Sequence, residues 1–420
     1  MNGSEVVRRL TRADWLALFA LALVLRLAAG LATGRLLHPE LFEYDAMARN
    51  WLAGRGLSYT HLGVVYYSFA PPLHSWIAIG SYWLTGSIVP LMLIQIAAGS
   101  AIAVAAAAIA DRLFRSRVAG LAAGALLAVH PGLLVYSIAK AHPLPFDALF
   151  FTLVLLQFFR LHERPTVSRA VVLGVIIGLG TLSRSTMLIF APIGSIWLFV
   201  VAAGTQRLAI IKLIAIAAVV SLAVLAPSAI RDSLIHKQPP FMVSPTGENF
   251  WKGNNPLATG HSLIHGTRDV VGALSPAERA DLESQPNEVA QSEWFMRKAK
   301  AFIREQPGAA ARLFVMKFFH FWWFAPQTGV LYPSAWRHMY MAYYVVALVL
   351  AAFGIARLRA IRSPAVSLAV LLGLFLLGLS VLQSVYYVEM RHRWGIEPML
   401  LALSGGGVAA VARRFRRDAS

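Results

Sequence analysis

Long apolar segments alternate with short clusters of arginine along this chain, and this alternation limits the folds that it can adopt. Segments such as residues 87–109 and 364–385 are long enough to cross a lipid bilayer as helices. Arginine clusters precede the first such segment and recur in every second connection, which is the charge bias of cytoplasmic loops. We therefore predict an all-α polytopic integral membrane protein with both termini in the cytoplasm.

Composition supports the same class. Hydrophobic residues make up 58% of the 420 residues and charged residues only 14%, which is unusual for a soluble protein of this length. The net charge of +18 resides largely in the loop clusters, so we expect a membrane-embedded protein with no nucleic-acid partner. The chain has no cysteine, which excludes disulfide bonds and thiolate chemistry.

We predict about ten membrane spans, within a range of eight to twelve. They are residues 15–33, 87–109, 118–137, 144–160, two short spans within 170–203, 208–228, 338–357, 364–385 and 394–412. Residues 71–85 and 309–326 are apolar as well, but counting them as spans would place arginine clusters on the wrong side. Both are therefore predicted to be interfacial helices.

This topology divides the chain into three parts. Residues 1–228 form an N-terminal transmembrane module with an acidic first external loop at 34–86. Residues 229–326 form a small external loop domain with its own interfacial helix, and residues 327–420 form the last transmembrane helices. Within the loop domain, the capping-box spacing of Ser275 and Glu278 predicts one helix, and Asn287 opens a second.

The first external loop carries three carboxylates, Glu40, Glu43 and Asp45, directly after a hydrophobic segment. The apolar residues that follow, from Ala46 to Leu52, have the spacing of one helix face. A short helix of this kind would lie on the membrane surface and hold its acids just above the lipid. A solvated acidic loop would have the same composition. The choice between a surface helix and a solvated loop therefore depends on residues elsewhere in the chain.

Further unusual polar residues are predicted on the same side of the membrane. His142 and Asp147 lie in a short proline-rich connection, where they form a candidate metal or acid–base pair or else only decorate a turn. Cations also occur on that side, where Arg391 and Arg393 break the charge rule, and a phosphate group suits a guanidinium well. These cations are Arg184, for which snorkelling toward water is the alternative, Lys317, Arg391 and Arg393.

The segment 247–260 is rich in turn-forming, aromatic and amide residues, which suit the binding of a polar ligand such as a sugar. Together with the carboxylates and cations, it suits a lipid-linked anionic substrate, because cations could hold phosphate while a carboxylate deprotonates an acceptor. A transporter would instead place its charges near mid-membrane. Here mid-span charge is nearly absent apart from Arg26.

Several motifs, taken in order, are similar to those of a known family. They are Glu40-Leu41-Phe42-Glu43-Tyr44, Ala48-Arg49-Asn50, Gly54-Arg55-Gly56, Pro71-Pro72-Leu73, the segment from Gly178 to Arg184, Trp251-Lys252-Gly253-Asn254-Asn255-Pro256, and Arg391-His392-Arg393 before Pro398. On these motifs the chain resembles the GT-C glycosyltransferases, in the bacterial branch related to protein O-mannosyltransferases and to the aminoarabinose transferase of lipid A. The resemblance implies a GT-C-like helix bundle in the bacterial inner membrane with a periplasmic active site.

The resemblance also implies a reaction. The donor would be a polyprenyl-phosphate sugar and the acceptor a lipid, a glycan or a protein, usually with inversion at the sugar. The expected ligands of the donor phosphate are Arg184, Lys317, Arg391 and Arg393. The expected contacts to the sugar or the acceptor are Tyr44, Trp251, Asn254 and Asn255.

One departure from the family affects the catalytic carboxylate. The family usually has Asp a few residues before the tyrosine that matches Tyr44, whereas this chain has Glu40. Misplacing a reacting group by about an ångström can cost roughly a hundredfold in rate. We expect Glu40 as the base, with Glu43 or Asp45 as alternatives. Loss of activity would instead leave a non-catalytic flippase for lipid-linked sugars, or a binding or transport protein. No cofactor is firmly expected, and a divalent metal at His142 and Asp147 stays open.

Overall fold

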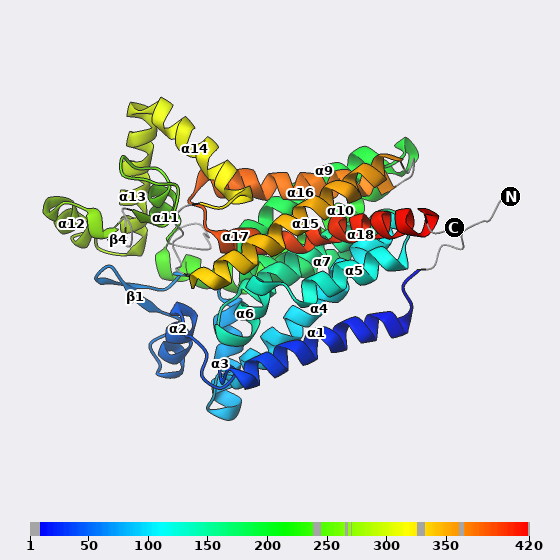
Figure 1. Cartoon of the computed structure of the whole chain (residues 1–420). Helices are drawn as coiled ribbons and strands as arrows, with labels where there is room; N and C mark the ends of the chain where they lie inside the picture. Colours follow the sequence, from blue (N-terminus) through cyan, green and yellow to red (C-terminus); the bar gives the residue numbers. More distant parts are fainter. Residues whose placement is uncertain are drawn as a thin grey trace.

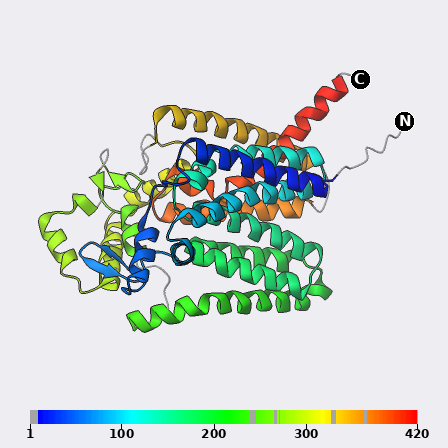
Figure 2. The same ribbon diagram turned by 90° about the horizontal axis from the view of Figure 1, so that it is seen from below.

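The computed structural model of this chain is a helix bundle with a layer of short helices and loops at one end (Figure 1). The structure describes residues 9–237, 245–264, 268–269, 271–325, 332–360 and 365–418. The start of the first bundle helix and the end of the last lie at the end opposite to that layer (Figures 1 and 2). The first described helix therefore begins, and the last described helix ends, on the same side of the bundle.

Six helices of the described residues are long and apolar enough to cross a membrane: α1 (Arg12–Ala32), α4 (Val89–Phe114), α7 (Leu144–Glu163), α10 (Arg207–His236), α15 (Ser334–Ala360) and α16 (Ala365–Val385). A seventh span results if α5 (Arg117–Ala128) and α6 (Pro131–Ala139), which meet at 50°, are counted together. The chain is thus a multi-pass, all-α membrane protein, as predicted.

The predicted count of ten spans is not reached by this criterion. The other three predicted spans are helices as well, namely α8 (Val167–Ser183), α9 (Phe190–Val201) with the short η1 (Ser185–Ile189) before it, and α18 (Glu397–Asp418). However, α8 and α9 are shorter than the 18 residues required of a span. The helix α18 is long enough, but it is not counted among the apolar spans and ends in a run of arginines. The η2 turn (Gly204–Gln206) precedes α10, and α17 (Met390–Trp394) precedes α18.

Small residues allow α18 to pack closely against its neighbours α15, α5 and α4. A Cβ atom on Gly405 would lie 2.2 Å from the carbonyl oxygen of Ala119, and one on Gly407 would lie 2.0 Å from that of Leu350. Neither glycine can therefore carry a side chain without moving a neighbouring helix. Close packing of this kind holds membrane helices together where lipid provides no hydrophobic driving force.

Arg26 lies inside the bundle, where it is fully buried in α1. Its Nη1 donates hydrogen bonds to the carbonyl oxygens of Ala22 at 3.1 Å and of Ala128 at 3.3 Å. Ala128 is the last residue of α5, directly before the bend into α6, and the carbonyl groups at a helix end lack helical partners. The guanidinium therefore stabilises the bend.

The layer at the other end, here called the loop layer, consists of α2 (Glu43–Leu52), the antiparallel hairpin of β1 (Tyr59–His61) and β2 (Val64–Tyr66), α3 (Leu73–Thr85), α11 (Thr246–Lys252), the pair β3 (Leu263–Ile264) and β4 (Arg268–Asp269), η3 (Val271–Ala273), α12 (Pro276–Glu283), α13 (Glu288–Glu305) and α14 (Pro307–Trp322). The helices predicted at 71–85 and 309–326 correspond to α3 and α14. The capping box of Ser275 and the N-cap of Asn287 begin α12 and α13. The predicted boundary between residues 326 and 327 lies outside the described residues.

Candidate functional site

A cavity of about 470 Å³ lies where the loop layer meets the bundle. Its walls come from α2, β1, the junction of α8 and η1, α11, the end of α16 and α17, so segments from the whole length of the chain converge there. The titratable side chains that line it are Glu43, Tyr44, His61, His142, Arg184, Glu248, Lys252, Tyr386, Tyr387, Arg391 and His392. We call it the Glu43 cavity.

Arg184 reaches the Glu43 cavity because the chain leaves α8 in an extended conformation at this residue, with φ −152° and ψ 118°. Its Nη1 lies 3.0 Å from Oδ2 of Asp147, and the Ser183 hydroxyl donates to the other carboxylate oxygen at 2.7 Å. Asp147 itself is only 1% exposed. The buried carboxylate of Asp147 therefore fixes the position of the Arg184 guanidinium at the cavity wall.

Arg391 enters the cavity from α17 and is held in the same way. Its Nε lies 2.8 Å from Oε2 of Glu389, the residue that precedes α17. The Ser262 hydroxyl donates to the other oxygen of this carboxylate. Burial alone would raise the pKa of Glu389, but Arg391 together with His392, the Ser262 hydroxyl and Lys252 outweighs burial and lowers it. The carboxylate therefore stays charged and keeps Arg391 in place.

Lys252 is the third cation of the cavity. Its Nζ lies 2.7 Å from Oε1 of Glu248, one turn earlier in α11, and Nε2 of His61 lies 2.9 Å from the second carboxylate oxygen. Burial would raise the pKa of Glu248, but Lys252 and His61 together lower it to about 2. The cavity thus contains three cations, each oriented by a buried carboxylate.

Glu43 differs from these three carboxylates. It is the first residue of α2 and lines the cavity, but it forms no ion pair with any other residue that the structure describes. Burial raises its pKa, and the nearby cations, Arg391 first among them, offset only part of this effect. A carboxylate with a raised pKa in a polar cavity is suited to accept a proton near neutral pH.

Two neutral side chains lie beside Glu43. The rings of Tyr44 and His142 approach each other edge to face with their centroids 6.0 Å apart. Burial, together with Arg391 and other cations, holds the pKa of His142 well below its usual value. Burial also raises the pKa of Tyr44 well above its usual value. Both groups therefore offer uncharged hydrogen-bonding partners to a ligand.

The other two predicted carboxylates lie outside the cavity. Oε2 of Glu40 lies 2.5 Å from Nζ of Lys140, and about half of the Glu40 side chain is exposed, at 52%. Asp45 accepts hydrogen bonds from Nε of Arg49 at 2.8 Å and from the Tyr82 hydroxyl. Of the three acids in the first loop, the structure thus brings Glu43 to the cations.

Arg393, predicted as a phosphate ligand, points into the bundle. Its Nε lies 2.6 Å from Oε1 of Glu397, and its Nη2 donates to the Tyr340 hydroxyl at 2.7 Å. The other oxygen of Glu397 lies 2.6 Å from Nε2 of His130. Arg393 is 1% exposed and Glu397 is 2% exposed, so these groups form a buried polar network away from the cavity.

The remaining predicted ligand contacts hold the turn after α11: Lys317, Trp251, Asn254 and Asn255. Nζ of Lys317 donates to the Gly253 carbonyl oxygen at 2.9 Å and to Oδ1 of Asn254 at 3.2 Å. Nδ2 of Asn255 donates to the Trp251 carbonyl oxygen at 2.8 Å. These four residues therefore support the end of the helix that carries Lys252 and do not line the cavity.

His142 and Asp147, the predicted metal pair, are engaged with different partners. Nδ1 of His142 accepts a hydrogen bond from the Leu144 amide at 3.1 Å, whereas Asp147 holds Arg184. Across the part of the chain that the structure describes, no group of three or more His, Asp or Glu side chains is arranged to hold a metal ion.

Among the charged and ion-paired groups at the cavity, Lys252, Glu248 and His61 were not assigned from the sequence, and neither was Glu389, which holds Arg391 but does not itself line the cavity. A local signal existed for the first two, because Glu248 and Lys252 are four residues apart and face each other on one helix. His61 meets Glu248, and Ser262 meets Glu389, only through contacts between segments that are distant in sequence, whereas Glu389 and Arg391 are two residues apart.

Comparison with known proteins identifies the architecture. Residues 70–230 match the sequence profile of the dolichyl-phosphate-mannose-protein mannosyltransferases. The oligosaccharyltransferase of Archaeoglobus fulgidus, tethered to an acceptor peptide containing the NVT sequon, superposes with a TM-score of 0.57 at 14% identity, over 96% of this chain and 50% of that chain. This chain has the GT-C fold. The archaeal enzyme AglB in complex with an inhibitory peptide and a dolichol-phosphate gives a TM-score of 0.55 at 14% identity, over 97% of this GT-C chain and 52% of its own.

The GT-C chain spans about half the length of these oligosaccharyltransferases. ArnT from Cupriavidus metallidurans bound to undecaprenyl phosphate is also similar, with a TM-score of 0.44 at 15% identity, over 96% of this chain and 79% of that chain. No curated protein matches in sequence. The resemblance to GT-C glycosyltransferases is confirmed, and the reaction has to be argued from the cavity.

Proposed function

We propose that this GT-C protein is a glycosyltransferase that moves a sugar from a polyprenyl-phosphate donor to an acceptor bound in the Glu43 cavity. The observation that carries the proposal is that one carboxylate, which has no ion-pair partner among the described residues, shares a cavity with three oriented cations. The donor class is supported by the similar archaeal enzyme, which was solved with a dolichol-phosphate. By the charge bias of the loops, the cavity would face the periplasm of a bacterial inner membrane.

In the first part of the proposed step, Glu43 accepts the proton of an acceptor hydroxyl or amine. The acceptor atom then forms a bond to the anomeric carbon while the bond from that carbon to the phosphate oxygen breaks. Attack from the face opposite to the leaving phosphate inverts the configuration of the sugar. The raised pKa of Glu43 makes it a better base than an ordinary surface carboxylate.

In the second part, the phosphate oxygen takes the electron pair of the broken bond, and polyprenyl phosphate leaves with an additional negative charge. Arg184 and Arg391 are suited to donate hydrogen bonds to it, and Lys252 adds a third positive charge. Because Asp147 and Glu389 hold the two guanidinium groups before any ligand binds, little reorganisation is needed as the charge develops.

This proposal places the base at Glu43 and not at Glu40, which was preferred from the sequence. A general base must lie within hydrogen-bond reach of the proton that it removes. Glu40 pairs with Lys140 outside the cavity, whereas Glu43 lines the cavity beside the cations. The two residues are both glutamates of the same loop, so they form a matched pair for an experiment.

The test uses the purified full-length protein in vesicles, supplied with polyprenyl-phosphate sugars and a membrane lipid extract. The release of free polyprenyl phosphate is measured. Glu43→Gln keeps the size of the side chain but cannot accept the proton, so we expect release to fall by about a hundredfold or more. Glu40→Gln is the matched control and should release polyprenyl phosphate at nearly the wild-type rate.

The reverse result, in which Glu40→Gln abolishes release and Glu43→Gln does not, would show that the base is wrongly assigned. A wild-type protein that binds a donor but releases no polyprenyl phosphate with any acceptor would contradict transfer itself. Movement of the lipid-linked sugar across the vesicle membrane would then be measured, because a flippase should tolerate Glu43→Gln.

A further inference from the structure

A second cavity of about 500 Å³ lies in the loop layer and shares no lining residue with the Glu43 cavity. It is a groove between the end of α13, one side of α14 and the segment 255–261, and we call it the α14 groove. Its apolar lining includes Phe302, Leu313 and Met316, and its polar lining includes Gln306 and Arg312. An apolar floor beside a cation suits a ligand that has both an apolar part and an anionic part.

Arg312 is the charged group of this groove. Its side chain is exposed, and no carboxylate of the described residues lies within ion-pair distance of it. In this respect it differs from the three cations of the Glu43 cavity, which are all paired. An unpaired guanidinium beside an apolar floor suits a phosphate group, to which it can donate two parallel hydrogen bonds.

The side of α14 that lines the groove lies next to an exposed apolar side of the same helix. At about 100° per residue, Lys317 and Phe321 lie on the face of α14 that is buried in the protein. Val315 and Phe319 lie on another face, where they are 66% and 58% exposed. The groove is lined by the strip of α14 between these two faces, which comprises Ala309, Leu313, Met316 and His320. The groove therefore borders an exposed apolar stripe.

The helix α14 lies next to a membrane span. It packs against α16, and in Figure 1 it leans outward from the bundle at the loop-layer end. An exposed apolar stripe on a helix at this level is typical of an interfacial helix whose apolar side enters the lipid. This would place the α14 groove beside the membrane surface, within reach of lipid headgroups.

We propose that the α14 groove binds an acidic membrane phospholipid, with the phosphate on Arg312 and the adjoining acyl chain on the apolar floor. The occupant would be a lipid of the surrounding membrane and not the polyprenyl-phosphate donor, because the donor site proposed above is the separate Glu43 cavity. The lipid site itself does not depend on the proposed transfer reaction.

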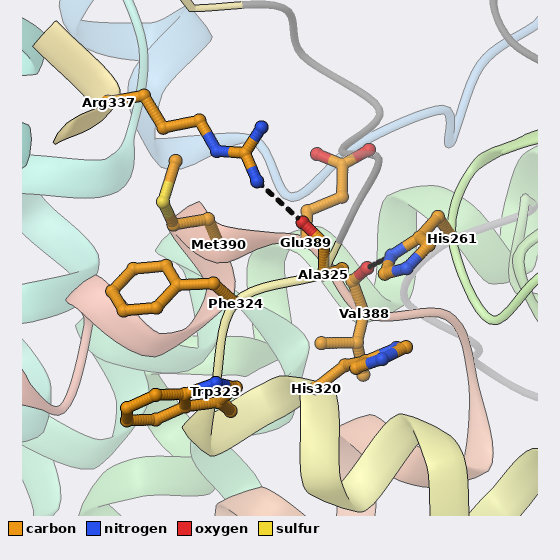
Figure 3. A pocket seen from close by; sticks show the side chains of 9 residues that line it. All are labelled: His261, His320, Trp323, Phe324, Ala325, Arg337, Val388, Glu389 and Met390. Carbon is orange, nitrogen blue, oxygen red and sulfur yellow. Dashed lines mark hydrogen bonds between the residues drawn. The ribbon is translucent and has the colours of Figure 1, made fainter. Parts of the chain in front are cut away.

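A short chain of contacts connects the groove to the Glu43 cavity. His261 lines the groove, and its Nδ1 donates to the Val388 carbonyl oxygen at 2.6 Å. The next residue, Ser262, donates to Glu389, which holds Arg391. Figure 3 shows His261 and His320 beside Val388 and Glu389 around a small hollow. A bound lipid would stabilise this arrangement, and this consequence, unlike the site, rests on the proposed function.

The experiment measures lipid binding to the full-length protein in a neutral detergent by native mass spectrometry. The probes are short-chain phosphatidylglycerol, short-chain phosphatidylcholine and inorganic phosphate, each added alone. We expect the wild type to retain phosphatidylglycerol in preference to the other two. Arg312→Gln should weaken that binding about tenfold, the usual effect of losing a hydrogen bond to a charged group. Arg304→Gln, which changes an exposed arginine of α13 outside the groove, is the matched control.

Equal binding of phosphatidylglycerol by the wild type and Arg312→Gln would overturn the proposal. Equal retention of phosphatidylcholine would also overturn it, because that lipid has the same phosphate but a choline cation that makes it neutral overall, so the groove would show no preference for an acidic lipid. Retention of inorganic phosphate at the level of the lipid would replace the lipid site with a simple anion site. Sugar transfer is not measured in this experiment. The lipid site and the proposed transfer reaction can therefore be contradicted independently of each other.

Discussion

Arg391 and Arg393 lie two residues apart in the short helix α17, yet they belong to different regions of the molecule. Arg391 lines the Glu43 cavity and is held by Glu389 at 2.8 Å. Arg393 lies in the bundle interior and is held by Glu397 at 2.6 Å. Each arginine has a buried carboxylate partner, but only the first also borders a space that can admit a ligand.

This difference shows that a buried ion pair alone does not identify a functional residue. A buried pair can hold a protein together or orient a group toward a ligand, and the two roles respond differently to mutation. Removal of Arg393 should affect chiefly folding, whereas removal of Arg391 should affect chiefly transfer. The following predictions test whether the two regions can be separated in this way.

The largest effect is expected for Arg393→Gln. This change leaves Glu397 charged and buried, which typically costs about 3–5 kcal/mol of stability. Thermal unfolding of the purified protein in detergent should show a clearly lower midpoint. The paired change of Arg393→Met with Glu397→Leu removes both charges and should recover part of the loss. A variant Arg393→Gln with wild-type unfolding but impaired donor binding would instead place Arg393 among the phosphate ligands.

Arg391→Gln is expected to reduce transfer by about a hundredfold to a thousandfold, the usual loss when one oriented donor to a developing negative charge is removed. Its effect on unfolding should be smaller than that of Arg393→Gln, since Arg391, the partner of Glu389, lines a cavity from which water can take its place. Both the rate of polyprenyl phosphate release and the unfolding midpoint are measured on the same preparation. Equal destabilisation by the two variants would remove the distinction between the regions.

The helices of both regions could be predicted from the sequence because their signals are local. The prolines before residue 73 and Gly86, which has φ 69°, bound α3 as expected, and Ser275 begins α12 with the predicted capping box. The sequence also placed Glu43, Tyr44, Arg184 and Arg391 among the candidate residues that the cavity now contains. Apolar segment length, turn residues and caps are properties of a few consecutive residues.

The orientation of individual side chains could not be predicted in the same way. Glu40 and Glu43 differ in position by three residues, and only the start of α2 at Glu43 and its docking on the bundle decide which one faces the cavity. Likewise, Arg391 and Arg393 each lie within four residues of their carboxylate partners, but nothing in this spacing shows that Arg391 would border a cavity and Arg393 would face the bundle interior. Such choices depend on contacts between segments that are distant in sequence.

The pH dependence of transfer should follow Glu43. A base acts only when unprotonated, so transfer should fall about tenfold for each pH unit below the pKa of Glu43. Burial raises this pKa, so the decline should begin at a higher pH than the ordinary glutamate value of 4.5 would give. The measurement is the rate of polyprenyl phosphate release as a function of pH. A decline centred at or below 4.5 would contradict the assignment.

The same raised pKa has a consequence for stability. The folded protein holds the Glu43 proton more tightly than the unfolded chain does, so this group contributes favourably at low pH and that contribution is lost as pH rises through the folded pKa. Glu43→Gln removes the cost of burying the charge. Its unfolding midpoint at neutral pH should therefore be at or above that of the wild type, although its transfer is lost.

The smallest effect is expected for Ser262→Ala, which tests whether the loop layer helps to orient Arg391. The Ser262 hydroxyl donates to Glu389, and Glu389 in turn holds Arg391. Loss of one hydrogen bond costs about 1 kcal/mol, so the apparent affinity for the donor should fall about fivefold. The pH dependence should be unchanged, because Glu43 keeps its surroundings.

Ser284→Ala, which removes a 2.7 Å hydrogen bond to the Asp281 carbonyl oxygen at the end of α12, is the control. If both serine variants bind the donor as the wild type does, Glu389 orients Arg391 without help from Ser262. The position of Arg391 would then depend on Glu389 alone, whereas the position of Arg393 depends on a network of several buried groups.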